Sequence, residues 1–295
     1  MTLEVLPGPL LASRTTLKLG GPALAEVVLT EPQDAAGLGG ILENLGGTPL
    51  VLGGGSNLLA RDGELPLVLV RPRIVGEPVI LRERPEGKIR VRVGAGVKLQ
   101  RFVAWLATQG LAALAGLVGV PGTVGGAVAG NAGSYGDETA ARLARVHLWT
   151  PGGGLVWLGR EALDFGYRHF APQGQPGQFL ILEAEFDCDV CEPIAIRQTM
   201  IAHLKKKRAS QPITAATAGC VFKNPPGGAA WRLLAQVGFA GKRLGNMAFS
   251  ALHANFLVNL GGGTSGEALE LIALAQGAVR ERLGSELEME VRVVP

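Results

Sequence analysis

Hydrophobic and polar residues alternate along much of this chain, and in a few segments the apolar positions recur at helical spacing. Strict alternation from Ile89 to Val93 predicts a strand. Shorter apolar runs bounded by turn residues predict further strands at residues 25–30, 50–52, 67–70, 145–150, 155–158, 179–186 and 287–294. Apolar stripes predict helices at residues 33–45, 194–208 and 264–283, and a further helix with Leu99, Phe102, Val103 and Leu106 on its apolar face and Gly110 at its C-cap. Thr264 and Glu267 have the spacing of a capping box at the start of the last helix.

Strands, turns and occasional helices follow one another without regular βαβ units, which is typical of the α+β class. The 295 residues correspond to two or three domains, at about 150 residues per domain. Hydrophobic residues make up 47% of the chain, which excludes a disordered chain. The net charge of +3 argues against a nucleic-acid-binding protein, whose basic surface is larger. Because three cysteines form no disulfide framework in a chain of this length, we expect a reducing compartment.

The stretch from Phe102 to Gly136 contains no charged residue, so a membrane segment has to be considered first. From Gly116 onward glycines recur every few residues, and the large apolar side chains that drive membrane insertion become scarce. We therefore expect no membrane span. A long uncharged glycine-rich loop is usually functional, and glycine lets the backbone approach a ligand closely, so we interpret residues 116–136 as a ligand-binding loop.

A second glycine-rich turn, Gly53 to Asn57, directly follows the strand that ends at Leu52. Such a turn presents several free backbone N–H groups and binds phosphate without a lysine. The segment is neither a Walker loop nor a G-x-G-x-x-G fingerprint, and taken alone it is equally consistent with an ordinary turn. Two such loops in one chain favour an extended ligand that contains a diphosphate and flat rings, which indicates a dinucleotide.

Six segments resemble the UDP-N-acetylenolpyruvoylglucosamine reductase (MurB) family in the family's own order. They are residues 15–23, 52–59, 116–136, 165–168, 218–225 and 287–292. The resemblance implies a PCMH- and MurB-like α+β fold, with FAD-binding subdomains at residues 1–50 and 51–192 and a substrate-binding domain at residues 193–295. It also implies reduction of the enolpyruvyl ether of UDP-N-acetylglucosamine to UDP-N-acetylmuramate for peptidoglycan synthesis in the cytoplasm. FAD would be bound non-covalently, and NADPH would donate the hydride.

By the same resemblance, both glycine-rich segments hold FAD. The residues expected at the cofactor are Gly53, Gly54, Gly55, Ser56, Asn57, Leu58, Gly119, Pro121, Gly122, Thr123, Gly125, Gly126 and Ala127. In the implied reaction, hydride from the flavin N5 adds to the β carbon, and negative charge develops at the α carbon and its carboxylate. Such a reaction needs a cation at the carboxylate and an acid at the α carbon.

Three residues match the family's catalytic positions. Arg168, otherwise a surface arginine after a turn, matches the arginine whose planar fork binds a carboxylate. Glu290 matches the glutamate that assists at the enolate, with Glu288 as the neighbouring alternative. Cys220 stands where the family usually has the serine that protonates the intermediate. A thiol is a stronger acid than an alcohol and preserves a proton donor, whereas a nearby guanidinium would favour the thiolate and reduce the acid fraction.

Substrate contacts are expected, again by resemblance, at Asn131, Tyr167, Arg208, Lys223, Asn224 and His253. Arg208 ends a basic run that begins at Lys205, and such a run is either a solvated helix end or a site for a diphosphate. Only about ten residues separate Arg168 from the strand at Phe179. The chain therefore resembles the shorter form of the family, which lacks an inserted loop with a substrate-contacting tyrosine.

Cys188 and Cys191 form a lone C-x-x-C pair without the further ligands of a zinc site, so we interpret them as partly buried thiols and expect no metal. The expected partners are NADPH and the UDP-sugar, with no nucleic acid, no membrane and a monomeric chain. Two other functions share some of these features. A flavin oxidase or dehydrogenase would have the same FAD-binding fold, often with covalently attached flavin, and a non-enzymatic nucleotide-binding module would bind no flavin.

Overall fold

The computed structural model describes residues 3–83, 87–173 and 178–295, which form two compact units. Unit 1 comprises Met1–Pro7, Ala25–Gly54 and Val68–Lys206. Unit 2 comprises Gly8–Leu24, Gly55–Leu67 and Lys207–Pro295. The predicted boundaries after residues 50 and 192 stay predictions, because a division into two units does not test a division into three.

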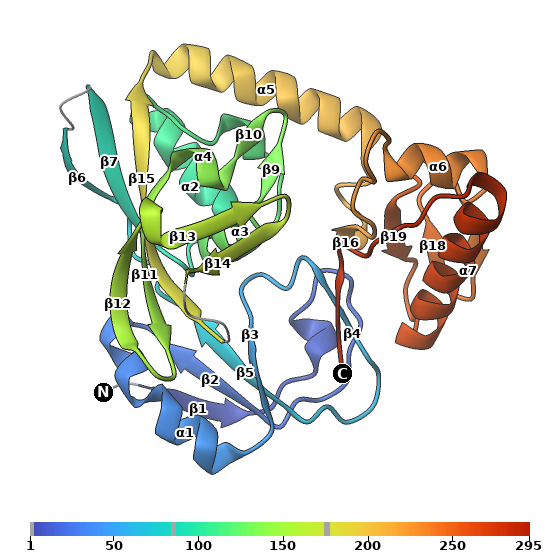
Figure 1. Cartoon of the computed structure of the whole chain (residues 1–295), viewed down its shortest axis with the longest axis horizontal. Coiled ribbons are helices and arrows are strands. Elements are labelled where there is room, and N and C mark those ends of the chain that lie inside the picture. Colours follow the sequence, from blue (N-terminus) through green and yellow to red (C-terminus); the bar gives the residue numbers. More distant parts are fainter. Residues whose placement is uncertain (1–2, 84–86, 174–177) are drawn as a thin grey trace. The chain divides into compact units, whose positions relative to one another are not determined.

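The first sheet of unit 1 has four strands in the order β1-β2-β5-β3 (Figure 1). These strands are β1 (Glu4–Pro7), β2 (Ala25–Leu29), β5 (Leu67–Pro72) and β3 (Thr48–Val51). The 3-10 helix η2 (Pro32–Gly37) and helix α1 (Leu38–Leu45) connect β2 to β3, where one helix was predicted. The parallel pairing of β2 with β5 is buried, and Val27, Leu29 and Val70 lie in a common core.

The second sheet of unit 1 is antiparallel, with the order β12-β11-β15-β7-β6 and the short β8 paired to β15. Its strands are β6 (Val79–Glu83), β7 (Lys88–Gly94), β8 (Leu111–Ala112), β11 (Leu143–Thr150), β12 (Gly154–Gly159) and β15 (Leu180–Val190). Helices α2 (Leu99–Thr108) and α3 (Val124–Ala129) pack on one face, where Phe102, Val128 and Phe186 are buried. The alternation predicted for β7 is confirmed, because Val91 and Val93 are buried in this core.

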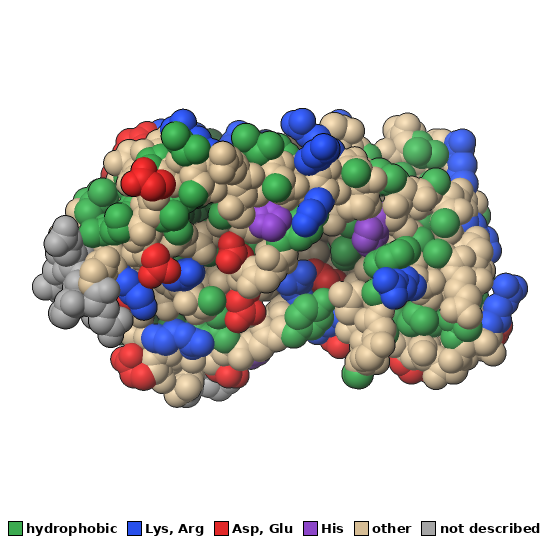
Figure 2. All heavy atoms as spheres, turned by 90° about the horizontal axis from the view of Figure 1, so that it is seen from above, with side chains coloured by type: hydrophobic (Ala, Val, Ile, Leu, Met, Phe, Trp, Pro, Cys, Tyr) green, Lys and Arg blue, Asp and Glu red, His purple; other side chains and the backbone are tan. Residues whose placement is uncertain are grey.

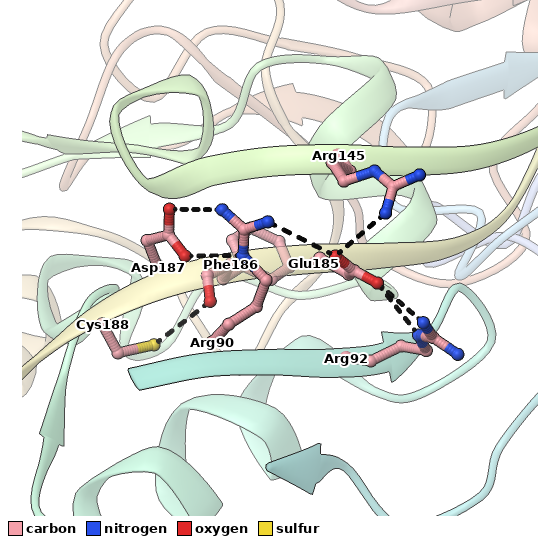
Figure 3. A network of polar contacts seen from close by, with 7 residues as sticks. All are labelled: Arg90, Arg92, Arg145, Glu185, Phe186, Asp187 and Cys188. Carbon is pink, nitrogen blue, oxygen red and sulfur yellow. Dashed lines mark hydrogen bonds and ion pairs between the residues drawn. The ribbon is translucent and has the colours of Figure 1, made fainter. Parts of the chain in front are cut away.

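Charged residues occupy the opposite face of this sheet (Figure 3). Glu185 on β15 is 1% exposed and accepts from Arg92, while the Arg90 guanidinium binds Asp187 through two bonds of 2.8 Å. Arg90 and Arg145 also approach Glu185, at 3.8 and 4.0 Å. The hydrogen bond to Asp187, together with the charges of Asp187 and Glu185, raises the pKa of Arg90 against the effect of its burial. This network satisfies a buried carboxylate on the sheet face.

Residues 116–136 are more regular than the loop that the sequence predicts. They contain helix α3 and strand β9 (Gly133–Ser134). Strand β9 forms a hairpin with β10 (Asp137–Glu138), and helix α4 (Thr139–Arg142) follows this hairpin. The helix forms because the Thr123 hydroxyl accepts from the Gly126 amide at 3.3 Å and caps its first turn. A further hairpin, β13 (Leu163–Gly166) and β14 (His169–Pro172), also belongs to unit 1.

Unit 2 is built on a four-stranded antiparallel sheet in the order β16-β19-β18-β17. Its elements are β4 (Leu58–Ala60), β16 (Ala216–Cys220), α6 (Ala230–Gln236), β17 (Arg243–Leu244), β18 (Met247–Phe249), β19 (Phe256–Asn259), α7 (Ser265–Leu283) and β20 (Arg292–Val294). Leu17, Leu19 and Leu59 are buried in the same core as Phe222 and Phe249. This shared core explains why two N-terminal segments belong to unit 2.

The predicted capping box of α7 is confirmed, and the predicted terminal strand is largely wrong. The Thr264 hydroxyl accepts from the Glu267 amide, and the Glu267 carboxylate accepts from the Thr264 amide at 3.0 Å. Only Arg292–Val294 form a strand, β20, which pairs in parallel with β4. Leu287, Met289, Val291 and Val293 alternate with polar residues in the sequence, but they do not share one buried face, because Met289 is 38% exposed whereas Val291 is buried.

Helix α5 (Pro193–Ser210) contains the helix predicted at residues 194–208, and the boundary between the units falls after its Lys206. Among the described residues, no helix is both long and apolar enough to cross a membrane. On the face drawn in Figure 2, both acidic and basic side chains are exposed among apolar and other side chains.

Candidate active site

The two glycine-rich segments meet within unit 1. A Cβ on Gly54 would lie 2.6 Å from the Gly122 Cα, and a Cβ on Gly53 would lie 2.5 Å from the Thr123 hydroxyl oxygen. Real Cβ atoms do not approach other atoms so closely, so only glycine fits at these positions. The structure therefore brings both predicted cofactor segments together through backbone contact.

The two segments offer different groups to a ligand. The N–H groups of Gly53, Gly54 and Gly55 make no hydrogen bond to other described residues. In the second segment, Gly125 donates to the Ala95 carbonyl. Three further amides of this segment donate within the protein: Gly119 to the Gln100 side chain, Val124 to the Val97 carbonyl and Gly126 to the Thr123 hydroxyl. The first turn thus carries free donors suited to phosphate, whereas the second segment supplies close-fitting shape.

Alanine at Gly54 should weaken flavin retention, because its methyl group would displace the Gly122 backbone. We expect the purified variant to bind FAD at least about tenfold more weakly, a cost of about 1–3 kcal/mol. Fluorescence titration of the flavin-free protein measures the affinity. Gly40→Ala in α1 is the matched control, because its Cβ meets nothing within 4 Å, and its affinity should equal that of the parent. Equal affinities for the Gly54 and Gly40 variants would contradict the glycine argument.

Arg168 lies in the two-residue turn of the β13–β14 hairpin, where Gly166 pairs with His169. Its φ of 56° is left-handed, a conformation that usually selects glycine or asparagine. An arginine at such a position costs about 1–2 kcal/mol, and strain of this kind gathers at functional sites. The guanidinium stands 5.1 Å from the centre of the Tyr167 ring, and Tyr167 is 53% exposed. The strained turn thus presents two of the predicted site residues.

Asn131 is buried beside this hairpin and acts within the protein. It is 3% exposed, its amide donates to the Gly166 carbonyl at 3.0 Å, and its oxygen accepts from the Ala140 amide at 3.0 Å. Its own φ is 36°. The sequence predicts a substrate contact here, whereas in the structure the side chain holds the start of the turn that carries Arg168.

Cys220 and Glu290 come from segments that the backbone joins inside unit 2. Cys220 ends β16, and the next residue, Val221, accepts from the Glu290 amide at 2.7 Å. Phe222 forms a bridge with Met289. The Asn57 amide donates to the Glu290 carbonyl at 3.1 Å, so a residue of the first glycine-rich turn supports the glutamate segment. Two predicted catalytic residues, far apart in sequence, are therefore brought onto adjoining segments.

Asn255 is a supporting residue that the sequence analysis misses. It is 2% exposed, and its side chain both accepts from the Phe222 amide at 3.0 Å and donates to the Phe222 carbonyl at 2.8 Å. Its own carbonyl accepts from Val221 at 2.8 Å. These three bonds fix the segment after Cys220. The only signal in the sequence is an asparagine two residues after His253, which marks no spacing of its own.

Three further substrate candidates in unit 2 contact other residues of the protein; they are Lys223, Asn224 and His253. The Lys223 ammonium lies 2.5 Å from Glu288, so the neighbouring alternative to Glu290 takes part in an ion pair. The Asn224 oxygen accepts from the Ala230 amide at the start of α6. His253 packs against Phe256 with ring centres 4.8 Å apart, and burial lowers its pKa.

The four basic residues at the end of α5 differ in how far their side chains are exposed. Arg208 is exposed, as are Lys205 and Lys206, whereas Lys207 is 2% exposed. Burial lowers the pKa of Lys207 to about 8. The end of α5 is thus only partly the solvated surface that the sequence suggests.

The buried lysine makes stability depend on pH. Because the folded-state pKa of Lys207 lies below its unfolded value of 10.5, the unfolded chain binds more protons between these values, and stability should rise with pH there. We expect a gain of about 3 kcal/mol in unfolding free energy across this interval. Denaturant unfolding at several pH values measures it, and Lys207→Met should lose the gain while Lys206→Met retains it. The same pH slope in both variants would contradict the assignment.

The two cysteines of the C-x-x-C pair differ in burial. Cys188 is fully buried in the strand β15, and burial raises its pKa to about 12, while Cys191 is half-buried. The described residues contain no group of three or more His, Cys, Asp or Glu suited to a metal ion. A cavity of about 520 Å³ on the charged sheet face, lined by Arg90, Arg145 and Trp157 among others, contains none of the predicted site residues.

Known proteins match the chain along nearly its whole length. Residues 28–159 match the family described as FAD binding domain, and residues 211–294 match the UDP-N-acetylenolpyruvoylglucosamine reductase C-terminal domain. The UDP-N-acetylenolpyruvoylglucosamine reductase of Nitratidesulfovibrio vulgaris is 50% identical, over 99% of this chain and 99% of that protein. The corresponding reductase of Geobacter sulfurreducens is 41% identical over 98% of this chain and 94% of its own length.

A solved structure shows a similar fold. The crystal structure of UDP-N-acetylenolpyruvylglucosamine reductase (MurB) from Thermus caldophilus superposes with a TM-score of 0.80 at 34% identity, and it covers 100% of both chains. The similarity therefore includes both units and both glycine-rich segments.

Proposed function

Because the chain belongs to the UDP-N-acetylenolpyruvoylglucosamine reductase family of FAD-dependent oxidoreductases, we propose that it reduces the enolpyruvyl ether of UDP-N-acetylglucosamine with NADPH. The product is UDP-N-acetylmuramate, and the role is peptidoglycan synthesis in the cytoplasm. The observation that carries this proposal is 50% identity over 99% of the chain to a reductase of that name.

The glycine-rich segments fit the cofactor. The free N–H groups of Gly53, Gly54 and Gly55 would hold the diphosphate, and the close contact of Gly54 with Gly122 shapes the wall beside it. When bound, FAD supplies the hydride that adds to the β carbon of the substrate's double bond. Asn57 contributes indirectly, because its amide holds the Glu290 carbonyl.

Three residues stabilise the negative charge of the enolate or supply the proton for the α carbon. Arg168 binds the substrate carboxylate with its planar fork and stabilises the negative charge that spreads into it. The Cys220 thiol donates its proton to the α carbon, which completes the saturated lactyl ether. Glu290 assists at the enolate from the segment that adjoins Val221.

Substrate binding divides into direct and supporting residues. The exposed Tyr167 and Arg208 contact the UDP-sugar directly, with Arg208 attracting its diphosphate. Asn131, Asn224 and His253 act by holding the elements that carry the site. Lys223 reaches a phosphate by exchanging its Glu288 partner.

Turnover by the purified protein tests the proposal. With NADPH and UDP-N-acetylenolpyruvoylglucosamine, we expect one NADPH to be consumed for each product molecule, which carries two additional hydrogen atoms by mass spectrometry. Denaturation should release free FAD, whereas a related oxidase with covalent flavin would keep it on the chain. Flavin-bound protein that oxidises no NADPH with this substrate would contradict the proposed function.

A further inference from the structure

The β9–β10 hairpin ends in an unusual turn. Tyr135 and Gly136 have φ values of 52° and 85°, which places two successive left-handed residues in a two-residue loop. Such loops favour asparagine or aspartate followed by glycine. An aromatic residue in this conformation costs about 1–2 kcal/mol and persists only where its surroundings hold it.

His203 on α5 supplies such surroundings. Its ring stacks on the Tyr135 ring with centres 4.5 Å apart and planes 13° from parallel. The His203 Nδ1 atom is buried and has no hydrogen-bond partner among the described residues. A buried nitrogen without a partner costs about 1–3 kcal/mol, so this ring is placed for its aromatic contact rather than for a hydrogen bond at Nδ1.

The base of the same hairpin lies beside Arg168. The Asp137 carboxylate accepts from the Gly116 amide at 2.6 Å, which anchors one strand. On the other strand, a Cβ on Gly133 would lie 3.6 Å from the Arg168 Nη1 atom. Asn131, just before the hairpin, holds the Gly166 carbonyl at the Arg168 turn. The hairpin and the arginine turn are thus neighbours at two points within unit 1.

We propose that His203 is a positioning residue for the reaction. By stacking on Tyr135 it holds the β9–β10 hairpin in place, and the hairpin, which lies beside the Arg168 guanidinium at Gly133, limits the space that this side chain can occupy. The inference rests on the proposed function for the role of Arg168.

The test compares His203→Ala, which removes the ring, with His203→Phe, which keeps a ring of similar shape. Stopped-flow spectroscopy of the FAD-loaded protein follows flavin reduction by NADPH and reoxidation by the UDP-sugar separately. We expect His203→Ala to slow reoxidation at saturating substrate by at least about tenfold, because a small misplacement of a catalytic group has a large effect on rate. Reduction by NADPH should change by less than about twofold, and His203→Phe should restore reoxidation.

A second variant and a second readout keep the proposal testable. Tyr135→Asn retains a residue that accepts the left-handed turn but removes the ring, and it should slow reoxidation as His203→Ala does. Amide hydrogen exchange should quicken at residues 133–138 in both variants and return to the wild-type rate in His203→Phe. Wild-type exchange and reoxidation in the ring-deleted variants would overturn the inference. A wild-type protein whose flavin the UDP-sugar does not reoxidise would instead contradict the proposed function, and the exchange data would still test the stack.

Discussion

Replacing Cys220 by alanine is expected to stop the reaction halfway. NADPH should still reduce the flavin at the normal rate, because that step needs no proton from this side chain. Reoxidation by the UDP-sugar should slow by at least about a hundredfold, since the α carbon loses its proton donor. Anaerobic stopped-flow absorbance separates the two steps.

Cys220→Ser is the matched control for this experiment, because it keeps a donor of similar size at the same place. Serine is also the residue that the family usually has here, so the variant should retain substantial turnover. The backbone bonds around Val221 and Asn255 do not involve the Cys220 side chain, so both variants should fold alike. Normal reoxidation in Cys220→Ala would show that the proton comes from another group.

Substitution of Arg168 by glycine should separate stability from activity. Glycine accepts the φ of 56° without strain, so the unfolding free energy should stay equal or rise by up to about 1 kcal/mol. Turnover should fall by at least about a hundredfold, because the developing charge loses its cation. Thermal or denaturant unfolding and steady-state kinetics measure the two effects on the same preparation.

Arg168→Lys separates the contribution of bidentate hydrogen bonding from that of the positive charge. Lysine keeps the cation but cannot bind a carboxylate through two parallel hydrogen bonds, so it should recover only part of the lost rate. A glycine variant as active as the wild-type protein would contradict the role of Arg168. A glycine variant of clearly lower stability would contradict the argument from backbone strain.

Local sequence signals predict some of the elements, and a long-range contact explains why the last one is shorter than predicted. The alternation at Ile89 to Val93 and the capping box at Thr264 act over a few residues, so both could be identified without the structure. The apolar pattern predicts one strand over residues 287–294, whereas in the structure the Glu290 and Val291 amides both donate to the Val221 carbonyl and interrupt it. The pattern of apolar residues does not indicate this contact.

In the candidate site, too, some features are evident from the local sequence and others depend on contacts between distant segments. The glycines of both loops stand out in the sequence, and the structure explains them by the approach of Gly54 to Gly122. The supporting bonds of Asn131 and Asn255 are not evident from the sequence, because an asparagine that supports a distant turn looks like any other, and the predicted substrate contact of Asn131 stays a prediction. Neither the left-handed φ of Arg168 nor its strain is visible without the backbone.

An anaerobic absorbance titration of the purified protein tests the central claim most directly. Addition of NADPH alone should bleach the bound flavin, and subsequent addition of UDP-N-acetylenolpyruvoylglucosamine should restore the oxidised spectrum in proportion to the amount added. A protein that binds no flavin, or a bleached flavin that stays bleached when the UDP-sugar is added, would contradict the account.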